Sequence, residues 1–371
     1  SVAQERKKRR IVIASILKPV DDTRMMEKMG MSLQQAGYDV TVIGYPAKSL
    51  KVWPGIRVIS LPAFARLSTG RIKARWTVLI KAWQERPDFF IFTTHELMGT
   101  ALLLKIFSNT TLVYDVRENY YRNIRYSEAF PRILRLPLAA MVRFKEKLLA
   151  PMIDHFLLAE RAYEKEFRFH RGGWTVIENK AVGIEPLARK RGERRLLFSG
   201  TLAVSTGVFR AINLAILMHQ QDPKVTLTIA GYAASRQVQE KLAGLAQVHS
   251  WITLVGITEL VSHEVIVQRI HESDLALVAY PPAHHTEGSR PTKLYEYLSA
   301  GLPMIIEGHW PWATEFTYCQ PFIITDYERP DIQNLMPQWD QGHFYPVPAK
   351  DVTWADEAAK LLKALAGSEA K

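Results

Sequence analysis

The amino-acid sequence predicts an α/β protein with two doubly wound parallel sheets. Three observations lead to this prediction: apolar runs alternate with helical patterns, the alternation restarts after residue 194, and a turn-rich segment separates the two series. Short apolar runs that alternate with helices are typical of parallel strands covered on both faces. With 371 residues, 47% of them hydrophobic, the chain is long enough for two domains with separate cores.

The first series contains five apolar runs with the length of buried strands and three segments with helical spacing. Gly37 follows the first helical segment, where a left-handed residue commonly ends a helix. We expect strands at 11–16, 40–43, 56–59, 88–92 and 111–115, and helices at 23–36, 72–84 and from His95 to about residue 107.

The second series repeats this order of elements. We expect strands at 195–198, 225–230, 251–255, 275–279 and 304–306, and helices at 208–220, 262–271, 291–300 and 352–366. Segment 180–194 contains Gly183, Pro186 and Gly192 with a cluster of charges, as in a linker. The predicted domains are therefore 1–182 and 190–350. A terminal segment, 351–371, is expected to pack back on the first domain. Because ligands bind beyond the carboxyl ends of such strands, the two sheets predict a cleft between the domains.

Charge and cysteine content narrow the classes of function. Residues 1–180 contain 31 Lys and Arg against 17 Asp and Glu, whereas the remainder is slightly acidic. This asymmetry indicates that the first half meets an anionic partner, such as a membrane surface or a phosphorylated acceptor. A nucleic-acid partner is disfavoured because the basic residues fit no known binding module. A single cysteine, Cys319, excludes a disulfide framework within the chain and fits a reducing compartment. No apolar run is long enough for a membrane span.

Two basic segments of the first half also carry apolar stripes. In 71–86, Ile72, Trp76, Leu79 and Trp83 fall on one side of a helix, and 131–149 combines apolar residues with five basic ones. Basic amphipathic helices can lie on anionic bilayers. The simpler interpretation, which we favour from the sequence, is that both stripes pack on the sheet while the charges face water.

The segment 289–303, SRPTKLYEYLSAGLP, has the start and stop signals of a short helix. Ser289 and Thr292 can accept hydrogen bonds from the first turn, and Pro291 is tolerated there because it lacks an N–H group. Gly301 and Pro303 end the helix.

Charged residues within this segment suggest a ligand. A helix N-terminus with Arg290 and Lys293 beside it is a suitable anion site. Glu296, one turn further along, can accept hydrogen bonds from both hydroxyl groups of a ribose. Together these features predict a nucleoside diphosphate. For Lys293 and Glu296 alone, a salt bridge on an exposed helix is the commoner explanation.

In its motifs the sequence resembles the GT-B glycosyltransferases and is similar to family 4 of the retaining enzymes. The resemblance rests on segments that occur in the family's order along nearly the whole chain. These segments are PVDDTRMMEKMGMSLQQAGYDVTVIG, PDFFIFTTHEL, LVYDVREN, LLFSGTL, LTIAGY, ITLVGIT, SDLALVAYP and SRPTKLYEYLSAGLPMII.

The resemblance implies that the second domain binds a sugar nucleotide. Glu296 would hold the donor ribose, the loops at 288–292 and 200–201 would contact the diphosphate, and the main chain at Ile257 would contact the base. The implied donor-binding residues are Gly200, Thr201, Gly231, Ile257, Ser289, Arg290, Pro291, Thr292, Lys293 and Glu296.

The resemblance also implies that the first domain binds the acceptor. Asp115, Arg117 and Glu118 are the catalytic candidates, expected to face the sugar or the acceptor hydroxyl, and Asp22, Arg24 and His95 are the acceptor-binding candidates. Two alternatives remain open. Arg117 could form an ordinary ion pair at a strand end. His95 could be a buried, hydrogen-bonded side chain.

Three departures from the family pattern concern charge. Gly288 occupies the place of the first of two carboxylates in many relatives, and Arg117 that of a histidine. The Arg and Lys that many relatives carry after the Gly-Thr-Leu loop are missing, and Arg210 is the first basic residue there. The diphosphate charge must then be met by Lys293, Arg290 or Arg210.

These features predict a glycosyltransferase that moves a sugar from a nucleoside-diphosphate sugar to an acceptor in glycan, cell-envelope polysaccharide or glycolipid synthesis. Because no Asp-x-Asp motif is present, we expect metal independence, and no cofactor apart from the sugar-nucleotide co-substrate. The expected location is cytoplasmic, with peripheral association at the inner face of the membrane. The alternatives are a nucleotide-sugar epimerase and a non-catalytic nucleotide-sugar-binding protein of the same fold.

Overall fold

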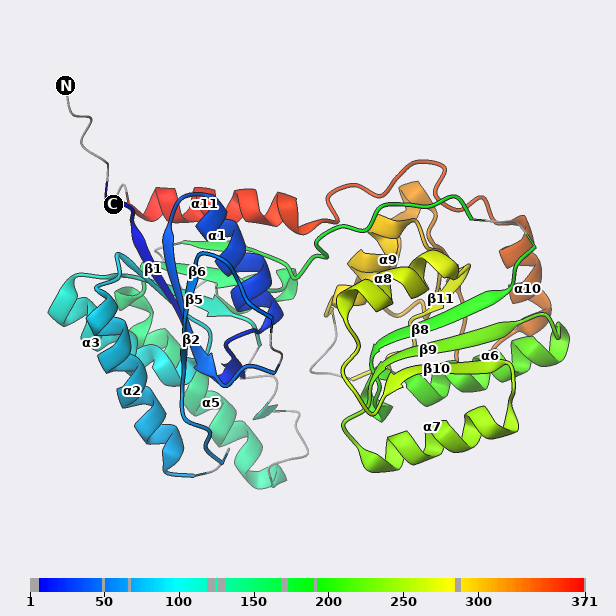
Figure 1. Cartoon of the computed structure of the whole chain (residues 1–371), viewed down its shortest axis with the longest axis horizontal. Coiled ribbons are helices and arrows are strands. Elements are labelled where there is room, and N and C mark those ends of the chain that lie inside the picture. The colour runs from blue at the N-terminus through cyan, green and yellow to red at the C-terminus, as the bar shows by residue number, and fades with distance from the viewer. Residues whose placement is uncertain are drawn as a thin grey trace. The chain divides into compact units, whose positions relative to one another are not determined.

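The computed structural model describes residues 7–48, 51–65, 68–118, 124–125, 131–167, 173–189, 192–283 and 288–369. The chain forms two compact units. The first comprises Ser1–Asn179 together with Trp354–Lys371, and the second comprises Lys180–Thr353. Both are α/β units with one parallel sheet each (Figure 1), which confirms the predicted fold class.

The first sheet has seven parallel strands in the order β3-β2-β1-β4-β5-β6-β7. From β1, the strands β2 and β3 follow on one side, whereas β4 to β7 follow on the other. The strand order therefore reverses between β1 and β4, and doubly wound sheets bind ligands at such a switch point. The strands are β1 (Arg10–Pro19), β2 (Asp39–Tyr45), β3 (Ile56–Ser60), β4 (Phe89–Phe92), β5 (Thr111–Val116), β6 (His155–Leu158) and β7 (Trp174–Val176).

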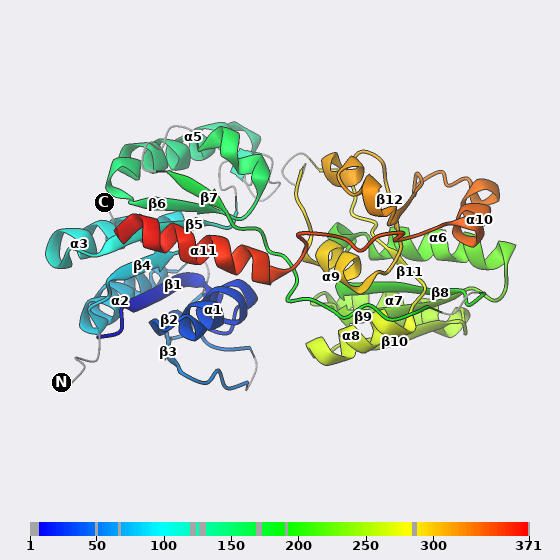
Figure 2. The same ribbon diagram turned by 90° about the horizontal axis from the view of Figure 1, so that it is seen from above.

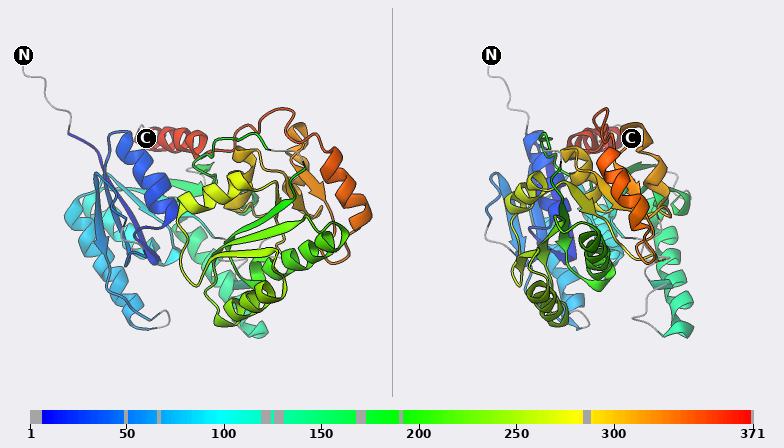
Figure 3. Two further views of the ribbon diagram at one scale, coloured as in Figure 1. Left: turned by 45° about the vertical axis from the view of Figure 1, so that its right-hand side comes forward. Right: turned by 90° about the vertical axis from the view of Figure 1, so that its right-hand side faces the viewer.

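Helices cover both faces of this sheet because its strands are apolar on both sides. On one face lie α2 (Gly70–Glu85), α3 (Met98–Ser108) and α5 (Arg132–Leu149). The π-helical segment η1 (Thr23–Gly30), α1 (Met31–Gln35) and the C-terminal α11 (Trp354–Glu369) pack on the other (Figures 2 and 3). Short 3₁₀ turns are η2 (His95–Leu97), η3 (Ala150–Met152) and η4 (Arg161–Glu166).

The second sheet has six parallel strands in the order β10-β9-β8-β11-β12-β13, so its switch point lies between β8 and β11. Its strands are β8 (Arg195–Thr201), β9 (Thr226–Tyr232), β10 (Ile252–Ile257), β11 (Leu275–Leu277), β12 (Met304–Ile306) and β13 (Phe322–Ile324). Its helices are α6 (Val208–Gln221), α7 (Arg236–Val248), α8 (His263–Glu272), α9 (Thr292–Ala300) and α10 (Ile332–Gln341), with 3₁₀ turns η5 (Val204–Thr206), η7 (Pro311–Thr314) and η8 (Thr317–Cys319).

The orientation of α2 corrects the sequence interpretation. Its small residues Ala74, Val78 and Ala82 pack on the sheet, whereas Trp76 and Trp83 are more than half exposed. The apolar stripe therefore faces away from the core that it was expected to join. No described helix is both long and apolar enough to cross a lipid bilayer.

Candidate functional site

Three glycines lie side by side at the carboxyl ends of β8, β9 and β10. The parallel register pairs Gly200 with Gly231 and Gly231 with Gly256. A Cβ atom on Gly231 would lie 1.8 Å from the carbonyl oxygen of Gly200, a distance that no side chain tolerates. These positions therefore require glycine, and they leave bare backbone next to the switch point of the second sheet.

Lys293, in the first turn of α9, is a buried cation beside this glycine row. Its side chain lies over the rings of Phe198 and Tyr280, with Nζ 4.3 Å and 5.0 Å from the ring centroids. A Cβ atom on Gly200 would lie 3.5 Å from the same Nζ. In the described part of the chain, Nζ has no hydrogen-bond partner. Burial lowers the pKa of Lys293 to about 8, although the nearby Glu296 acts to raise it. A buried ammonium group in this state favours an anionic ligand.

The amino end of α9 adds main-chain donors to this site. The helix begins after Pro291 at the N-cap position, and among the described residues no side chain caps it. The predicted hydrogen bonds from the first turn to Ser289 and Thr292 are therefore not formed in this part of the chain. Instead, the carbonyl oxygen of Ser289 accepts a hydrogen bond from Trp312 Nε1 at 3.0 Å, which fixes the preceding loop. Within the described ranges, the N-terminal N–H groups of the helix have no side-chain acceptor and can therefore bind a ligand or solvent.

Glu296 lies one turn into α9 and is half-buried. Burial raises the pKa of Tyr280 and Tyr297, and the charge of Glu296 raises each further. Tyr297 shares a short hydrogen bond with Ser199 Oγ, 2.5 Å long, which ties α9 to the end of β8. The carboxylate of Glu296 is thus held near Lys293 on a fixed helix.

Ile257 ends β10 in a backbone conformation that is rare for its type. Its φ is +70°, and β-branched residues seldom adopt positive φ. Around it, the N–H of Thr258 donates to the carbonyl oxygen of Gly256 at 2.9 Å, and the carbonyl oxygen of Ile257 accepts from Ala233 N at 2.8 Å. Strained residues of this kind gather at binding sites, where the surrounding structure holds them in place.

Two of the three cations that could neutralise a diphosphate are already paired. Arg290 donates to Glu315. Arg210 donates to Glu307 at 2.5 Å and to Glu328 at 2.8 Å. Lys293 has no such carboxylate partner in the described ranges. The structure therefore singles it out among the three.

A second candidate site lies in the first unit, at the switch point between β1 and β4. A cavity of about 390 Å³ opens there. It is lined by Ser15, Ile16, Leu17, Lys18, Tyr45, Phe64, Thr93, Arg117 and Glu118. Two of the lining residues, Arg117 and Glu118, were predicted as catalytic. Sequence reasoning missed Lys18 and Thr93. Each follows the last apolar residue of a run that predicts a strand, Leu17 and Phe92 respectively.

Ion pairs organise the polar wall of this cavity. Arg117 donates to Asp22 Oδ2 at 2.5 Å, and Lys18 Nζ lies 3.3 Å from Glu118 Oε1. Asp22 also accepts a hydrogen bond from Met25 N at 3.1 Å, so it caps η1. Burial acts to raise the pKa of Asp22, but Arg117 and the Met25 N–H lower it overall. The strand-end ion pair considered for Arg117 from the sequence is thus formed, with Asp22 as the partner.

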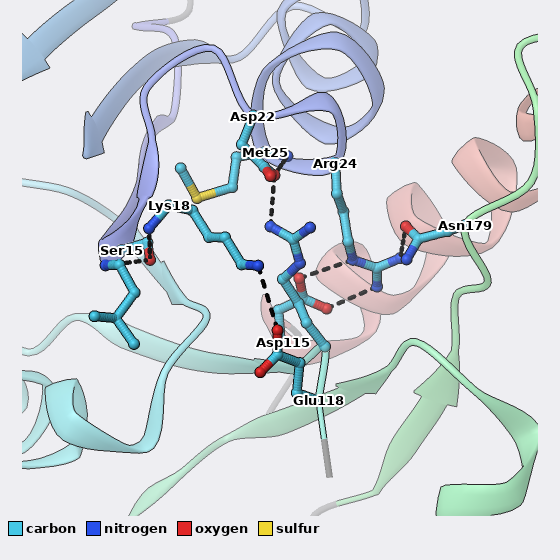
Figure 4. A network of polar contacts seen from close by, with 10 residues as sticks. Ser15, Lys18, Asp22, Arg24, Met25, Asp115, Glu118 and Asn179 are labelled. Atoms are coloured by element: carbon cyan, nitrogen blue, oxygen red, sulfur yellow. Dashed lines mark hydrogen bonds and ion pairs between the residues drawn. The ribbon is translucent and has the colours of Figure 1, made fainter. Parts of the chain in front are cut away.

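Arg24 and Asp115 form a buried ion pair in the first unit (Figure 4). Arg24 Nε and Nη2 donate to the two oxygens of Asp115 at 2.9 Å and 2.7 Å. Arg24 Nη1 also donates to Ile177 O at 2.7 Å. The same nitrogen donates to Asn179 Oδ1 at 2.9 Å (Figure 4). Both charged side chains are almost fully buried, and neither lines the cavity. These contacts of Arg24 connect η1 with β5 and with the end of the first unit, and the roles predicted for Asp115 and Arg24 stay predictions.

His95 follows β4 but does not line the cavity either. Burial lowers its pKa to about 4, and the neighbouring cations Lys145, Arg71 and Arg75 contribute to this shift. Its imidazole is therefore neutral at physiological pH. This environment favours the alternative considered from the sequence, in which His95 is a buried side chain and does not contact the acceptor.

Comparisons with known proteins place the fold. No family model and no curated protein matches the sequence. Among solved structures, a sucrose-phosphate synthase from Thermosynechococcus elongatus is 14% identical, with a TM-score of 0.71 over 98% of this chain and 100% of that chain. HepE of Anabaena, solved with UDP and glucose, is 14% identical, with a TM-score of 0.64 over 96% and 99%. A putative UDP-N-acetylglucosamine 2-epimerase from Listeria monocytogenes is 13% identical, with a TM-score of 0.60 over 96% of both chains. At such identities the similarity establishes the fold, GT-B, and no more.

Proposed function

We propose that the protein is a glycosyltransferase that moves a sugar from a nucleoside-diphosphate sugar to a saccharide acceptor. The observation that carries this proposal is Lys293, a buried cation with no acceptor in the described residues, held against the glycine row at a switch point. A diphosphate would supply the missing negative charge. The structural similarity to HepE, solved with UDP and glucose, supports the same ligand class.

The residues of the donor site would each bind a different part of the sugar nucleotide. Negative charge grows on the diphosphate as the glycosidic bond breaks, and Lys293 together with the uncapped end of α9 would stabilise it. Glu296 would hold the ribose hydroxyls, and the main chain at Ile257 would face the base. We propose that this arrangement works without a metal ion or a cofactor and retains the configuration of the transferred sugar.

On the acceptor side, the cavity of the first unit is the proposed binding site. Its wall carries Lys18, Arg117 and Glu118, which can bind the hydroxyl groups of a sugar. The proposed acceptor is a glycan or a lipid-linked saccharide of envelope synthesis. The basic first unit, with its net charge of +14 over residues 1–180, would associate with the cytoplasmic face of a membrane.

Calorimetry with sugar nucleotides tests the donor site. Lys293→Met is expected to weaken binding of the nucleoside diphosphate at least about tenfold, since charge-assisted contacts contribute roughly 1.5–3 kcal/mol. Glu296→Ala should weaken binding of the nucleotide but leave binding of free diphosphate unchanged. Lys224→Met is the matched control, because Lys224 is exposed in the turn before β9 of the same unit. Equal affinities of wild type and Lys293→Met would reject the proposal.

An epimerase is the second candidate, favoured by the structural similarity to the putative 2-epimerase of Listeria monocytogenes. Incubation with each sugar nucleotide alone separates the two activities. An isomerised sugar nucleotide formed without acceptor would indicate an epimerase. A bound donor that is neither transferred, hydrolysed nor isomerised would indicate a non-catalytic nucleotide-sugar-binding protein.

A further inference from the structure

The outward face of α2 is an exposed apolar stripe. Ile72, Trp76, Ile80 and Trp83 follow one another at helical spacing, and each is between 52% and 58% exposed. The inward face consists of the small residues Ala74, Val78 and Ala82, which allow the helix to lie close to the sheet. The large apolar residues of α2 are therefore not required for packing on the sheet. Two exposed tryptophans on one helix are not explained by the core of the unit.

Helix α5 repeats this pattern. Ile133, Met141, Phe144 and Leu148 lie on one side at the same spacing, and each is between 61% and 88% exposed. Its inner face contains the buried residues Ala139, Val142 and Glu146, and Glu146 accepts a hydrogen bond from the hydroxyl group of Tyr114 in β5 at 3.2 Å. Because α2, α3 and α5 cover the same face of the first sheet, both stripes point away from the same side of the unit (Figure 1). Together, Ile72, Trp76, Ile80, Trp83, Ile133, Met141, Phe144 and Leu148 form what we name the outer apolar face.

The charges around this face are almost all positive. On α2, Lys73 and Lys81 are exposed, and the one acidic residue, Glu85, pairs with Arg57 at 2.7 Å. α5 carries five Lys and Arg, and its one acidic residue, Glu146, is buried. Among the described residues, an exposed apolar stripe flanked mainly by basic side chains matches a surface that is anionic outside and apolar inside.

We propose that the outer apolar face seats the first unit on an anionic lipid bilayer, with Trp76, Trp83 and Phe144 inserted at the headgroup level. Tryptophan is the side chain that favours this level most, and Lys and Arg at the margins attract anionic headgroups. A second copy of this chain is a poorer occupant, since pairing the same face would bring its basic residues together.

The position of α2 links this face to the acceptor cavity. Gly70, the first residue of α2, touches Phe64 of the cavity wall: a Cβ atom on Gly70 would lie 2.6 Å from Phe64 Cβ. A bilayer along α2 would therefore lie next to the cavity, where a lipid-linked saccharide could enter. The docking surface stands on the exposed residues alone, whereas this use of it rests on the proposed function.

Flotation with vesicles tests the docking surface in the full chain. We expect wild type to float with vesicles of phosphatidylcholine and phosphatidylglycerol at low salt. Pure phosphatidylcholine should bind much less, and high salt should weaken binding. The double variants Trp76→Ser/Trp83→Ser and Ile133→Ser/Phe144→Ser should each lower partitioning at least about tenfold, whereas Trp76→Phe/Trp83→Phe should retain most of it. Val248→Ser, at an exposed apolar position of the second unit, is the control and should bind like wild type.

Melting temperature, nucleotide affinity, fluorescence quenching and oligomeric state distinguish the possible outcomes. Melting temperature and nucleotide affinity should not change in the serine variants, because the substituted side chains are exposed. Brominated lipids should quench wild-type fluorescence more than that of Trp76→Phe/Trp83→Phe. Absent flotation of wild type, or equal flotation of the serine variants, would overturn the proposal. So would a wild-type dimer that the serine variants turn into a monomer, which would assign the face to a second copy.

Discussion

At the scale of single residues, Lys293 shows how a site can be recognised by an uncompensated charge. Burial of an ammonium group is costly, and proteins usually pair such a group or lower its pKa. Here the pKa is lowered to about 8 and the surroundings are aromatic rings. The sequence marked Lys293 only as one of three cations. Its lack of a carboxylate partner in the described structure depends on tertiary packing, which no spacing rule reveals.

This pKa predicts how nucleotide affinity depends on pH. Lys293 is charged below a pH of about 8 and loses its proton above it, and a diphosphate favours the charged form. Affinity for a nucleoside diphosphate should therefore fall as pH rises from 7 to beyond about 8, with proton uptake on binding in that range. Calorimetry in two buffers of different ionisation enthalpy measures the uptake. In Lys293→Met the dependence should vanish, and its persistence there would assign it to another group.

We also expect that removal of the Lys293 charge by substitution makes the folded protein more stable. The pKa of Lys293 is lower in the folded state than in the unfolded chain, so its burial destabilises the protein at pH 7 and less so as pH rises toward 10. Lys293→Met should raise the free energy of unfolding at pH 7 by roughly 1 kcal/mol or more, since an uncompensated buried charge is removed. Urea unfolding of wild type and variant measures this difference. A less stable variant would show that the charge is compensated in the folded protein.

At the scale of elements, the glycines at the carboxyl ends of β8 and β9 allow the two backbones to approach each other closely. Gly231→Ala would place a methyl group 1.8 Å from Gly200 O, so one strand must move. We expect a loss of about 3 kcal/mol or more and a weakened nucleotide site, as for other forced backbone shifts. The control is Gly244→Ala in α7, where a Cβ atom meets nothing within 4 Å and should stabilise the helix slightly. Thermal unfolding compares the two, and equal effects would contradict the steric argument.

The sequence predicts those helices and strands whose pattern is local, and it does not predict which side of a helix meets the sheet. Alternating apolar runs and helical patterns give the parallel sheets because period and length are local properties. Periodicity also finds the stripe of α2, but it cannot say which side meets the sheet. The side with Ala74, Val78 and Ala82 packs inward because small residues allow a close approach. Short strands such as β6 and β7 were missed since three or four residues carry little pattern.

The candidate site shows a similar limit. Residues on one motif, such as Lys293 and Glu296, could be predicted because their spacing is fixed by a helix. Arg24 and Asp115 are 91 positions apart, and their pairing appears only in the folded unit. The catalytic role of Asp115 and the acceptor-binding role of Arg24 were therefore predicted without this ion pair, and both roles stay predictions.

At the scale of the whole molecule, the C-terminal helix belongs to the first unit. Trp354 Nε1 donates to Ser32 Oγ at 2.8 Å, and Glu357 accepts a hydrogen bond from Glu178 N at 2.8 Å. Leu361 and Leu365 are buried against the sheet. The chain thus enters the second unit at Lys180 and returns at Trp354, so the second unit is a continuous insertion in the first.

This organisation predicts two calorimetric transitions that respond to different changes. Leu361→Ala removes a fully buried side chain from the first unit and should lower only the transition of that unit, by the equivalent of roughly 2–5 kcal/mol. Leu335→Ala, the matched variant in α10, should lower only the other transition. Since the proposed nucleotide site lies wholly in residues 180–353, a nucleoside diphosphate should raise the transition that Leu335→Ala lowers and leave the other in place. If all three changes move a single transition, the two units unfold together, and each then stabilises the other through the two chain segments that join them.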